Sequence, residues 1–371
     1  MTSGMPGRPR RRRVLLTTDT AGGVWNYSME LAAALEREGV AVTLAALGSE
    51  PSPGQRRDAE LRGLPLRSFR CRLPWMPEPW QDVSAAGRWL RALADEVAAD
   101  IVHLNEPVLA APEWPVPTLV AAHSCVLSWW EAVLGEPAPR SWDRYRDAMR
   151  AGLAAAHAVV APSRAMLGAV RRHYGVRNGR VIPNGRDPTG LQPEVKDGYV
   201  LTAARLWDGA KNVAALDRAA AGLAWPVYAA GDPASPDGKA VTLTHAVPLG
   251  QLDRRRLAGW MSRAAVFALP ARYEPFGLSV LEAALAGCAL VLGDIPSLRE
   301  HWDGIAIFVP PDDPELLRLA LTSLIEDPQL RHTLAMRARR RALGFSARRM
   351  ARAYLTEYDA VLAGRVAACA S

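Results

Sequence analysis

The chain has 371 residues, of which 49% are hydrophobic and 22% are charged, and its formal net charge is +7. This length predicts two domains, and the composition is that of a folded globular protein, which excludes a largely disordered chain. No apolar stretch approaches the roughly 20 residues that span a bilayer, and no apolar segment follows the N-terminal arginines, so we expect neither a transmembrane helix nor a secretory signal. The four cysteines lie far apart without metal-binding spacing, so we expect reduced thiols in a cytoplasmic protein.

Residues 1–13 form a basic tail that contains Arg8, Arg10, Arg11, Arg12 and Arg13. Such a tail can bind nucleic acid or an anionic lipid surface. No signature of a nucleic-acid-binding fold accompanies the charge, so we expect no nucleic-acid partner. Two interpretations stay open: a solvated tail, and a peripheral contact with the inner face of the membrane.

Short apolar runs alternate with helical stretches along the chain, which is typical of a parallel sheet covered by helices. Strands are predicted first at 14–18, 40–47, 101–104, 119–122 and 159–161, with a helix at 26–38 that ends at Gly39. Prolines and glycines cluster at 183–198 and predict a linker. Further strands are predicted at 199–203, 226–230, 241–247, 266–269, 289–292 and 305–309, and Ser346 predicts the N-cap of a final helix.

Two successive α/β series of similar size predict two Rossmann-like domains that face each other across a cleft, with ligands at the carboxyl ends of the strands. We therefore divide the chain into the tail (1–13), an N-terminal domain (14–187), a C-terminal domain (196–345) and a C-terminal helix (346–371).

One segment, 272–284, reads Arg-Tyr-Glu-Pro-Phe-Gly-Leu-Ser-Val-Leu-Glu-Ala-Ala and directly follows a predicted strand. Glu274 lies in a tight loop with Pro275 and Gly277, and Glu282 lies on the helix predicted at 278–286. The free N–H groups at the start of this helix suit an anionic ligand, and a carboxylate beside them can accept hydrogen bonds from sugar hydroxyls. A surface loop with two unrelated glutamates is the alternative.

Other strand ends carry cations, glycines and a histidine. Arg205 and Lys211 follow the strand at 199–203, where two cations form either a phosphate clamp or ordinary surface charge. Gly22 and Gly23 follow the first strand and either let the backbone approach a ligand or only make a turn; they do not form a G-x-G-x-x-G dinucleotide motif. His123 follows the strand at 119–122 and is either structural or in contact with a ligand.

These segments together resemble the retaining glycosyltransferases of family four, which have the GT-B fold. Seven residues separate Glu274 from Glu282, which is similar to that family's E-x7-E motif. The likeness covers nearly the whole chain and includes H-L-N-E-P at 103–107, A-H-S at 122–124, A-P-S-R at 161–164, I-P-N-G at 182–185 and E-A-x-x-x-G at 282–287. It implies an α/β GT-B protein whose C-terminal helix returns to the first domain.

The resemblance implies transfer of a hexose from a nucleoside-diphosphate sugar to a hydroxyl acceptor, with retention of configuration and with neither a cofactor nor a metal. Arg205 and Lys211 would bind the donor diphosphate, and Glu274 and His123 would contact the donor sugar. Glu282 would hold the ribose. The other implied donor-binding residues supply backbone or small side chains near the phosphates and the sugar: Gly22, Gly23, Phe276, Gly277, Leu278 and Ser279.

Two departures from the family pattern are visible. Lys211 is six positions after Arg205, one more than the commonest spacing, and Gly209 could absorb the extra residue. The glycine pair usual near 294–300 is absent, although Glu300 is kept.

The acceptor is not identified by the sequence: a small molecule, a glycan and a lipid-linked group all stay open. The competing enzyme readings are a GT-B nucleotide-sugar epimerase and a phosphorylase, and the non-enzymatic reading is a nucleotide-sugar-binding subunit. The presence of Arg205, Lys211, Glu274 and Glu282 together argues against a subunit that has lost catalysis.

Overall fold

The computed structural model describes residues 11–111, 113–234, 238 and 240–369, so Arg8 and Arg10 of the basic tail lie outside the described residues. By their contacts, the residues fall into two compact units. Unit 1 comprises Met1–Ala121, Asp147–Val160 and Ala351–Ser371, and unit 2 comprises Ala122–Arg146 and Ala161–Met350. The two sheets are described in turn below.

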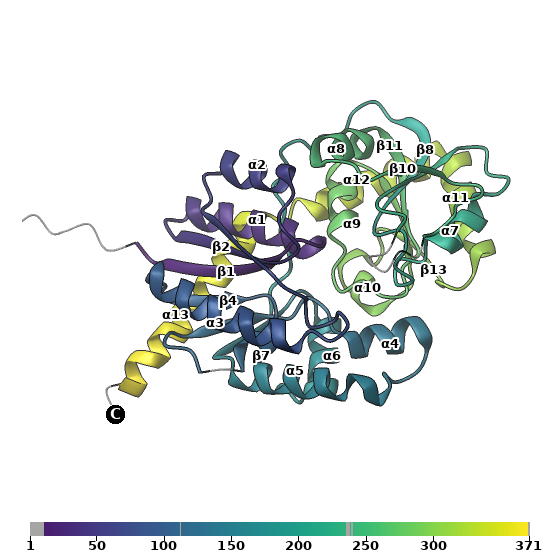
Figure 1. The fold of residues 1–371 in the computed structure, drawn as a ribbon. Helices are drawn as coiled ribbons and strands as arrows, with labels where there is room; N and C mark the ends of the chain where they lie inside the picture. The colour runs from purple at the N-terminus through teal and green to yellow at the C-terminus, as the bar shows by residue number, and fades with distance from the viewer. Residues whose placement is uncertain (1–10, 112, 235–237, 239, 370–371) are drawn as a thin grey trace, which may run out of the picture. The chain divides into compact units, whose positions relative to one another are not determined.

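The first sheet has seven strands in the order β3-β2-β1-β4-β5-β6-β7, and its pairings from β3 to β6 are parallel. Its strands are β1 (Arg13–Asp19), β2 (Ala41–Gly48), β3 (Leu66–Arg70), β4 (Ile101–Leu104), β5 (Thr118–Ala121), β6 (Ala158–Ala161) and β7 (Gly179–Val181). The helices that alternate with them are α1 (Gly23–Arg37), α2 (Pro53–Leu61), α3 (Trp80–Glu96), α4 (Val126–Leu134), α5 (Asp143–Ala155) and α6 (Arg164–Tyr174) (Figure 1). Two 3₁₀ turns, η1 (Pro107–Ala110) and η2 (Arg140–Trp142), complete this part.

The second sheet has six parallel strands in the order β10-β9-β8-β11-β12-β13. They are β8 (Asp197–Ala203), β9 (Val227–Ala230), β10 (Val247–Gly250), β11 (Ala264–Leu269), β12 (Ala289–Gly293) and β13 (Ile307–Val309). The following helices are α7 (Val213–Ala220), α8 (Arg254–Arg263), α9 (Leu278–Leu285), α10 (Pro296–Trp302), α11 (Pro314–Glu326), α12 (Pro328–Ala342) and α13 (Ala347–Cys369). Both sheets have the strand order of Rossmann-like folds, so the predicted α/β class with two such sheets is confirmed.

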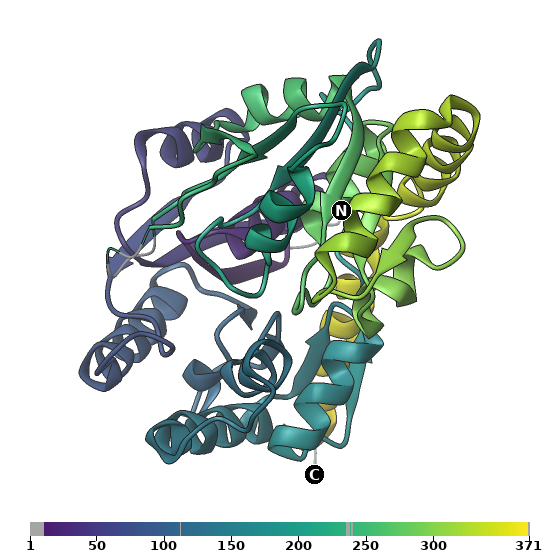
Figure 2. The ribbon, with the colours of Figure 1, turned by 90° about the vertical axis from the view of Figure 1, so that its right-hand side faces the viewer.

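Alternation along the strands of the second sheet divides its core into two layers. Phe267 and Leu269 of β11 face a cluster shared with α8, α9 and α12, whereas Val266 and Ala268 face one shared with α7 and α11. Figure 2 shows α11 and α12 side by side beside this sheet.

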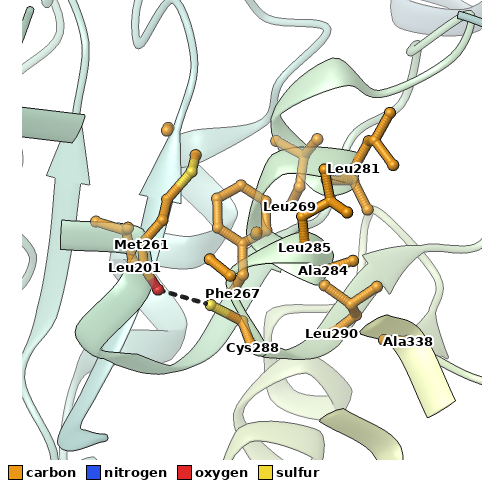
Figure 3. Packing of buried hydrophobic residues seen from close by; sticks show 14 of the residues in the cluster. Leu201, Met261, Phe267, Leu269, Leu281, Ala284, Leu285, Cys288, Leu290 and Ala338 are labelled. Atoms are coloured by element: carbon orange, nitrogen blue, oxygen red, sulfur yellow. Dashed lines mark hydrogen bonds between the residues drawn. The ribbon is translucent and has the colours of Figure 1, made fainter. Parts of the chain in front are cut away.

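Figure 3 shows the layer under α9, where the buried side chains of Phe267, Leu281 and Leu285 pack together. The Sγ atom of Cys288 donates to the carbonyl of Met261 at 3.2 Å, and burial raises the pKa of this thiol to about 11. Each such buried side chain contributes roughly 1.5–3 kcal/mol by leaving water. The packing therefore holds α9, and with it the loop at its N-terminus, on a rigid support.

One predicted strand is wrong. Residues 241–246 form no strand, because the carboxylate of Asp217 accepts the N–H groups of Thr244, His245 and Ala246 at 2.8–3.0 Å. The strand begins only at Val247 and lies at the edge of the sheet, where Pro248 is tolerated. The helix predicted at 26–38 starts three residues earlier, at Gly23, and Gly39 beyond its end has the expected positive φ of 88°.

Candidate functional site

The loop between β11 and α9 is organised around the carboxylate of Glu274. Its Oε1 atom accepts the N–H groups of Gly277 at 2.9 Å and of Phe276 at 3.3 Å. Gly277 has φ +91°, a backbone conformation that strongly favours glycine, and a Cβ atom there would also crowd the side chain of Leu298 at 3.2 Å. No side chain caps α9, so no side chain at the N-cap accepts from the first N–H groups of this helix, which lie at this loop.

Lys211 forms an ion pair with Glu274 in the same loop region. Its Nζ lies 2.7 Å from Oε2 of Glu274, and the two side chains are only 13% and 15% exposed. Burial alone would raise the pKa of Glu274, but the ammonium group of Lys211 and the two backbone N–H groups hold it below its usual value. Glu274 is therefore a carboxylate at neutral pH, and it neutralises Lys211, the cation that the family resemblance assigns to the donor diphosphate.

Arg205, the second predicted cation, is held by Asp208. The guanidinium Nη2 donates to Oδ2 of Asp208 at 2.7 Å, while Oδ1 accepts from Nε1 of Trp129 at 3.2 Å and from the N–H of Ala210 at 3.0 Å. Asp208 is buried, whereas Arg205 remains 44% exposed. The carboxylate thus fixes the loop that contains the extra residue between Arg205 and Lys211, and it leaves one side of Arg205 open to solvent.

Glu282 also has a cationic partner, one that the sequence analysis missed. Its Oε1 lies 2.8 Å from Nε of Arg186, and both residues are buried, at 8% and 4% exposure. Arg186 belongs to the segment after β7, and its backbone N–H donates to the carbonyl of Phe345 at 2.9 Å. A Cβ atom on the neighbouring Gly185 would lie 2.3 Å from the carbonyl oxygen of Ser346, so this crossing of two chain segments requires glycine.

Tyr273 connects the Glu274 loop to the start of α4. Its hydroxyl accepts the N–H of Cys125 at 3.1 Å and lies 2.9 Å from Oγ of Ser128. His123 is two residues before Cys125, so these bonds tie the segment that carries His123 to the loop that carries Glu274. Burial lowers the pKa of His123 to about 4, which makes it a neutral imidazole at pH 7. The only sequence signal for Tyr273 is its place next to Glu274 in the segment 272–284.

The remaining predicted residues occupy different settings. The ring of Phe276 is buried and packs against His301 and Phe345, so only its backbone can meet a ligand. Leu278 and Ser279 lie in the first turn of α9 and are half-buried. Gly22 and Gly23 are exposed at the start of α1 in unit 1, where Gly22 has φ +142° and no side chain caps the helix.

Glu300 has a structural role instead of a site role. Its two carboxylate oxygens share the single backbone N–H of Arg164, at 2.8 and 2.9 Å, and one of them also accepts the N–H of Ala165 at 3.2 Å. The residue therefore caps the N-terminus of α6, a position where a negative charge also stabilises the helix dipole.

Metal and membrane signals are weak in the described part of the chain. No group of three or more His, Cys, Asp or Glu residues that could hold a metal ion occurs among the described residues. Asp313 serves as the N-cap of α11 by accepting the N–H of Leu316, and Asp312 pairs with Arg272.

None of the described helices has the length and apolarity needed to cross a membrane. Arg11 and Arg12 of the tail pair with Glu36 and Asp359.

Comparison with known proteins covers both halves of the chain. Residues 21–189 match the model of Glycosyltransferase Family 4, and residues 242–341 match that of Glycosyl transferases group 1. Over 95 residues the chain is 38% identical to the glycogen synthase of Mycobacterium tuberculosis (strain CDC 1551 / Oshkosh), which covers 25% of this chain and 23% of that protein. The chain thus spans about a quarter of the length of this curated relative.

Two solved structures share the fold over almost the full length. The sucrose-phosphate synthase from Thermosynechococcus elongatus superposes with a TM-score of 0.77 at 20% identity, covering 95% of this chain and all of that one. HepE from Anabaena, in complex with UDP and glucose, gives 0.76 at 17% identity, covering 94% and 100%. These neighbours confirm the GT-B fold. With both family models matched in chain order on this fold, the chain belongs to glycosyltransferase family 4.

Proposed function

We propose that this protein transfers a hexose from a nucleoside-diphosphate sugar to a hydroxyl group of an acceptor, with retention of anomeric configuration and without a metal ion. The observation that carries the proposal is the pair of Lys211 and Glu274 beside the uncapped start of α9, with Arg205 held by Asp208 in the loop that leads to Lys211, all in one unit. Two cations and free helix N–H groups suit a diphosphate. The solved neighbour HepE binds UDP and glucose, which supports a nucleotide-sugar donor for this chain as well.

In the proposed reaction, the bond between the anomeric carbon and the diphosphate oxygen breaks while a bond to the acceptor oxygen forms. Negative charge develops on the departing diphosphate, and the acceptor proton passes to one of its oxygens. Arg205, Lys211 and the N–H groups at the start of α9 would stabilise this charge, so the proposal needs no metal to neutralise it. Glu282 would accept the ribose hydroxyls, and Glu274, beside Lys211, would face the donor sugar.

The charge balance of the site adds a requirement for the donor. Lys211 and the N–H of Gly277 are both engaged by Glu274, and Arg205 is engaged by Asp208. A bound diphosphate therefore shares or replaces these carboxylate contacts. The half-exposed guanidinium of Arg205 can meet the phosphate first, since it keeps an open side while paired.

A transfer assay tests the proposal. We expect a glycosylated product from UDP-, GDP- or ADP-hexose with a panel of hydroxyl acceptors, and EDTA should leave the rate of transfer unchanged. Proton NMR coupling constants should show that the product keeps the donor's anomeric configuration. Arg205→Gln should slow transfer by about 100-fold, the typical loss of one such contact. The matched control is Arg218→Gln, an exposed arginine on α7.

Three results would refute the proposal: an inverted product, strict dependence on a divalent cation, or epimerisation of the donor without any acceptor.

The free thiols of Cys71, Cys125 and Cys288 suit a reducing compartment, so we place the reaction in the cytoplasm. Cell fractionation with an antibody tests that placement.

A further inference from the structure

Asp208 is a buried residue midway between the two cations of the proposed diphosphate site. Its backbone N–H donates to the carbonyl of Arg205 at 3.1 Å, and its carbonyl accepts the N–H of Lys211 at 2.8 Å. Two successive turns therefore place both cations relative to this one residue. Asp208 also lies in the stretch that is one residue longer than the commonest spacing of the family pattern.

The side chain of Asp208 uses both of its oxygen atoms. Oδ2 accepts from Nη2 of Arg205 at 2.7 Å, and Oδ1 accepts from the N–H of Ala210 at 3.0 Å and from Nε1 of Trp129 at 3.2 Å. The two bonds to Oδ1 fix the orientation of the carboxylate and, through Oδ2, that of the guanidinium. Burial alone would raise the pKa of Asp208, but the nearby cations and the two N–H donors hold it below its usual value. The group is therefore a carboxylate at neutral pH.

Trp129 comes from α4, which is distant in sequence from Asp208 but belongs to the same unit. The loop packs on one face of this helix. A Cβ atom on Gly209 would lie 3.4 Å from Cγ1 of Val133, one helical turn after Trp129. Glycine thus lets the backbone of the loop lie close to α4, where the indole N–H reaches the carboxylate.

Arg205 keeps most of its hydrogen-bonding capacity while it is paired with Asp208. A guanidinium has five N–H donors, and among the described residues only Asp208 accepts from that of Arg205. Its central carbon lies 5.4 Å from the centre of the Trp207 ring, a cation–π contact, and the side chain is 44% exposed. The cation is therefore held in place and still open to an anion from solvent.

We propose that Asp208, itself held by Trp129, is a positioning residue that aims the guanidinium of Arg205 at the donor diphosphate. The inference rests on the proposed function, in which Arg205 stabilises the departing diphosphate. A planar guanidinium binds phosphate oxygens in pairs, so its orientation matters, and a misplacement of about 1 Å can cost about 100-fold in rate. A cation that is already fixed also loses less freedom when the donor binds.

Kinetics on the full chain test the proposal, with kcat/KM for the donor as the readout. Donors face both oxygens of Asp208, so the amide of Asp208→Asn must turn its own N–H₂ group toward one of them. We expect this variant to be slower by about 10- to 100-fold, up to the loss expected for Arg205→Gln. Trp129→Phe removes one hydrogen bond and should cost about three- to tenfold. Trp130→Phe, which changes the neighbouring ring that packs edge-on against Trp129, is the matched control and should stay within about twofold.

Double variants separate a positioning role from a structural one. In a chain that already carries Arg205→Gln, Asp208→Asn and Trp129→Phe should each add less than about twofold, because the guanidinium through which they act is gone. A general weakening of the fold would slow both backgrounds equally.

The indole N–H resonance of Trp129 gives a second measurement that needs no transfer reaction, and Trp129→Phe assigns the signal by removing it. We expect UDP to shift this resonance and uridine, which lacks the diphosphate, to leave it in place. Asp208→Asn should abolish the response to UDP. The indole signal of Trp130 is the internal control.

Three outcomes would overturn the proposal: losses that add fully to that of Arg205→Gln, tighter UDP binding by Asp208→Asn, or a Trp129 signal that saturating UDP leaves in place. Tighter binding would mean that Asp208 competes with the phosphates for Arg205. If Asp208→Asn does not fold, Trp129→Phe decides, since a wild-type rate or a fully additive loss in that variant is equally contradictory. If no sugar is transferred but UDP still shifts the Trp129 signal through Asp208, the proposed function fails and the positioning role stands.

Discussion

At the scale of single residues, each acidic residue of the motif has a cationic partner in the ligand-free site. Glu274 pairs with Lys211 and Glu282 with Arg186, both with little exposure to solvent. Glu274 and Glu282 could be singled out from the sequence by the motif spacing and Lys211 by its place after a strand, and their donor-binding roles stay a prediction. Arg186 could not, because it comes from a proline- and glycine-rich segment that contains no pattern pointing to Glu282.

The two glutamates should fail in different ways. Glu274→Gln removes the charge that neutralises Lys211, so we expect UDP affinity within about threefold of wild type but transfer slowed by about 100-fold or more. Glu282→Gln replaces one of the two acceptor oxygens proposed for the ribose by an amide donor and removes the charge that pairs with Arg186, so UDP affinity should fall about tenfold. Calorimetry with UDP and initial-rate kinetics separate the two, and the exposed Glu326→Gln is the control. Equal loss of UDP affinity in both variants would contradict the assignment.

At the scale of helices and strands, the sequence predicts what is continuous and apolar and misses what depends on distant partners. The fully buried strands β11 and β12 and the buried part of β8, residues 199–203, are mostly apolar and were predicted within a few residues. The edge strand β3 has only half-buried and exposed residues, so no apolar run marks it. The strand expected at 241–247 failed because Asp217, on another element, takes the backbone N–H groups that a strand would have used.

The contact between α9 and the segment after β7 predicts a large coupling between Arg186 and Glu282. Arg186→Met leaves a buried carboxylate without that cation, and such a loss typically costs about 3–5 kcal/mol of folding stability. Adding Glu282→Leu to Arg186→Met also removes the negative charge of Glu282, so the double variant should regain much of this stability. It should bind UDP no better than Glu282→Leu alone. Urea unfolding of the four proteins gives the coupling energy. Additive effects on stability would show that the pair does not act as a unit.

At the scale of the whole molecule, the boundaries expected at 187 and 346 stay a prediction, and the contact-based units divide the chain differently. Residues 122–146 group with unit 2 because contacts such as Tyr273 with Cys125 and Trp129 with Asp208 join segments about 80 to 150 residues apart in sequence. No local sequence pattern indicates contacts between segments so far apart. The final helix was predictable from Ser346, whose Oγ accepts the N–H of Arg349 at 3.2 Å.

The end of the chain should be essential to the core of unit 1. Tyr358 of α13 is fully buried, and its hydroxyl lies 2.7 Å from Nδ1 of His103 on β4, a residue 255 positions away. Tyr358→Ala should lower the free energy of unfolding by about 3–5 kcal/mol through the cavity it leaves. Tyr358→Phe keeps the ring, loses only the hydrogen bond, and should cost about 1–3 kcal/mol. Because the predicted donor cations lie in unit 2, the folded Tyr358→Phe protein should bind UDP like the wild type. Thr356→Ala, at an exposed position two residues earlier in the same helix, should stay within about 0.5 kcal/mol. Urea unfolding in which Tyr358→Ala is as stable as Thr356→Ala would show that α13 is not part of that core.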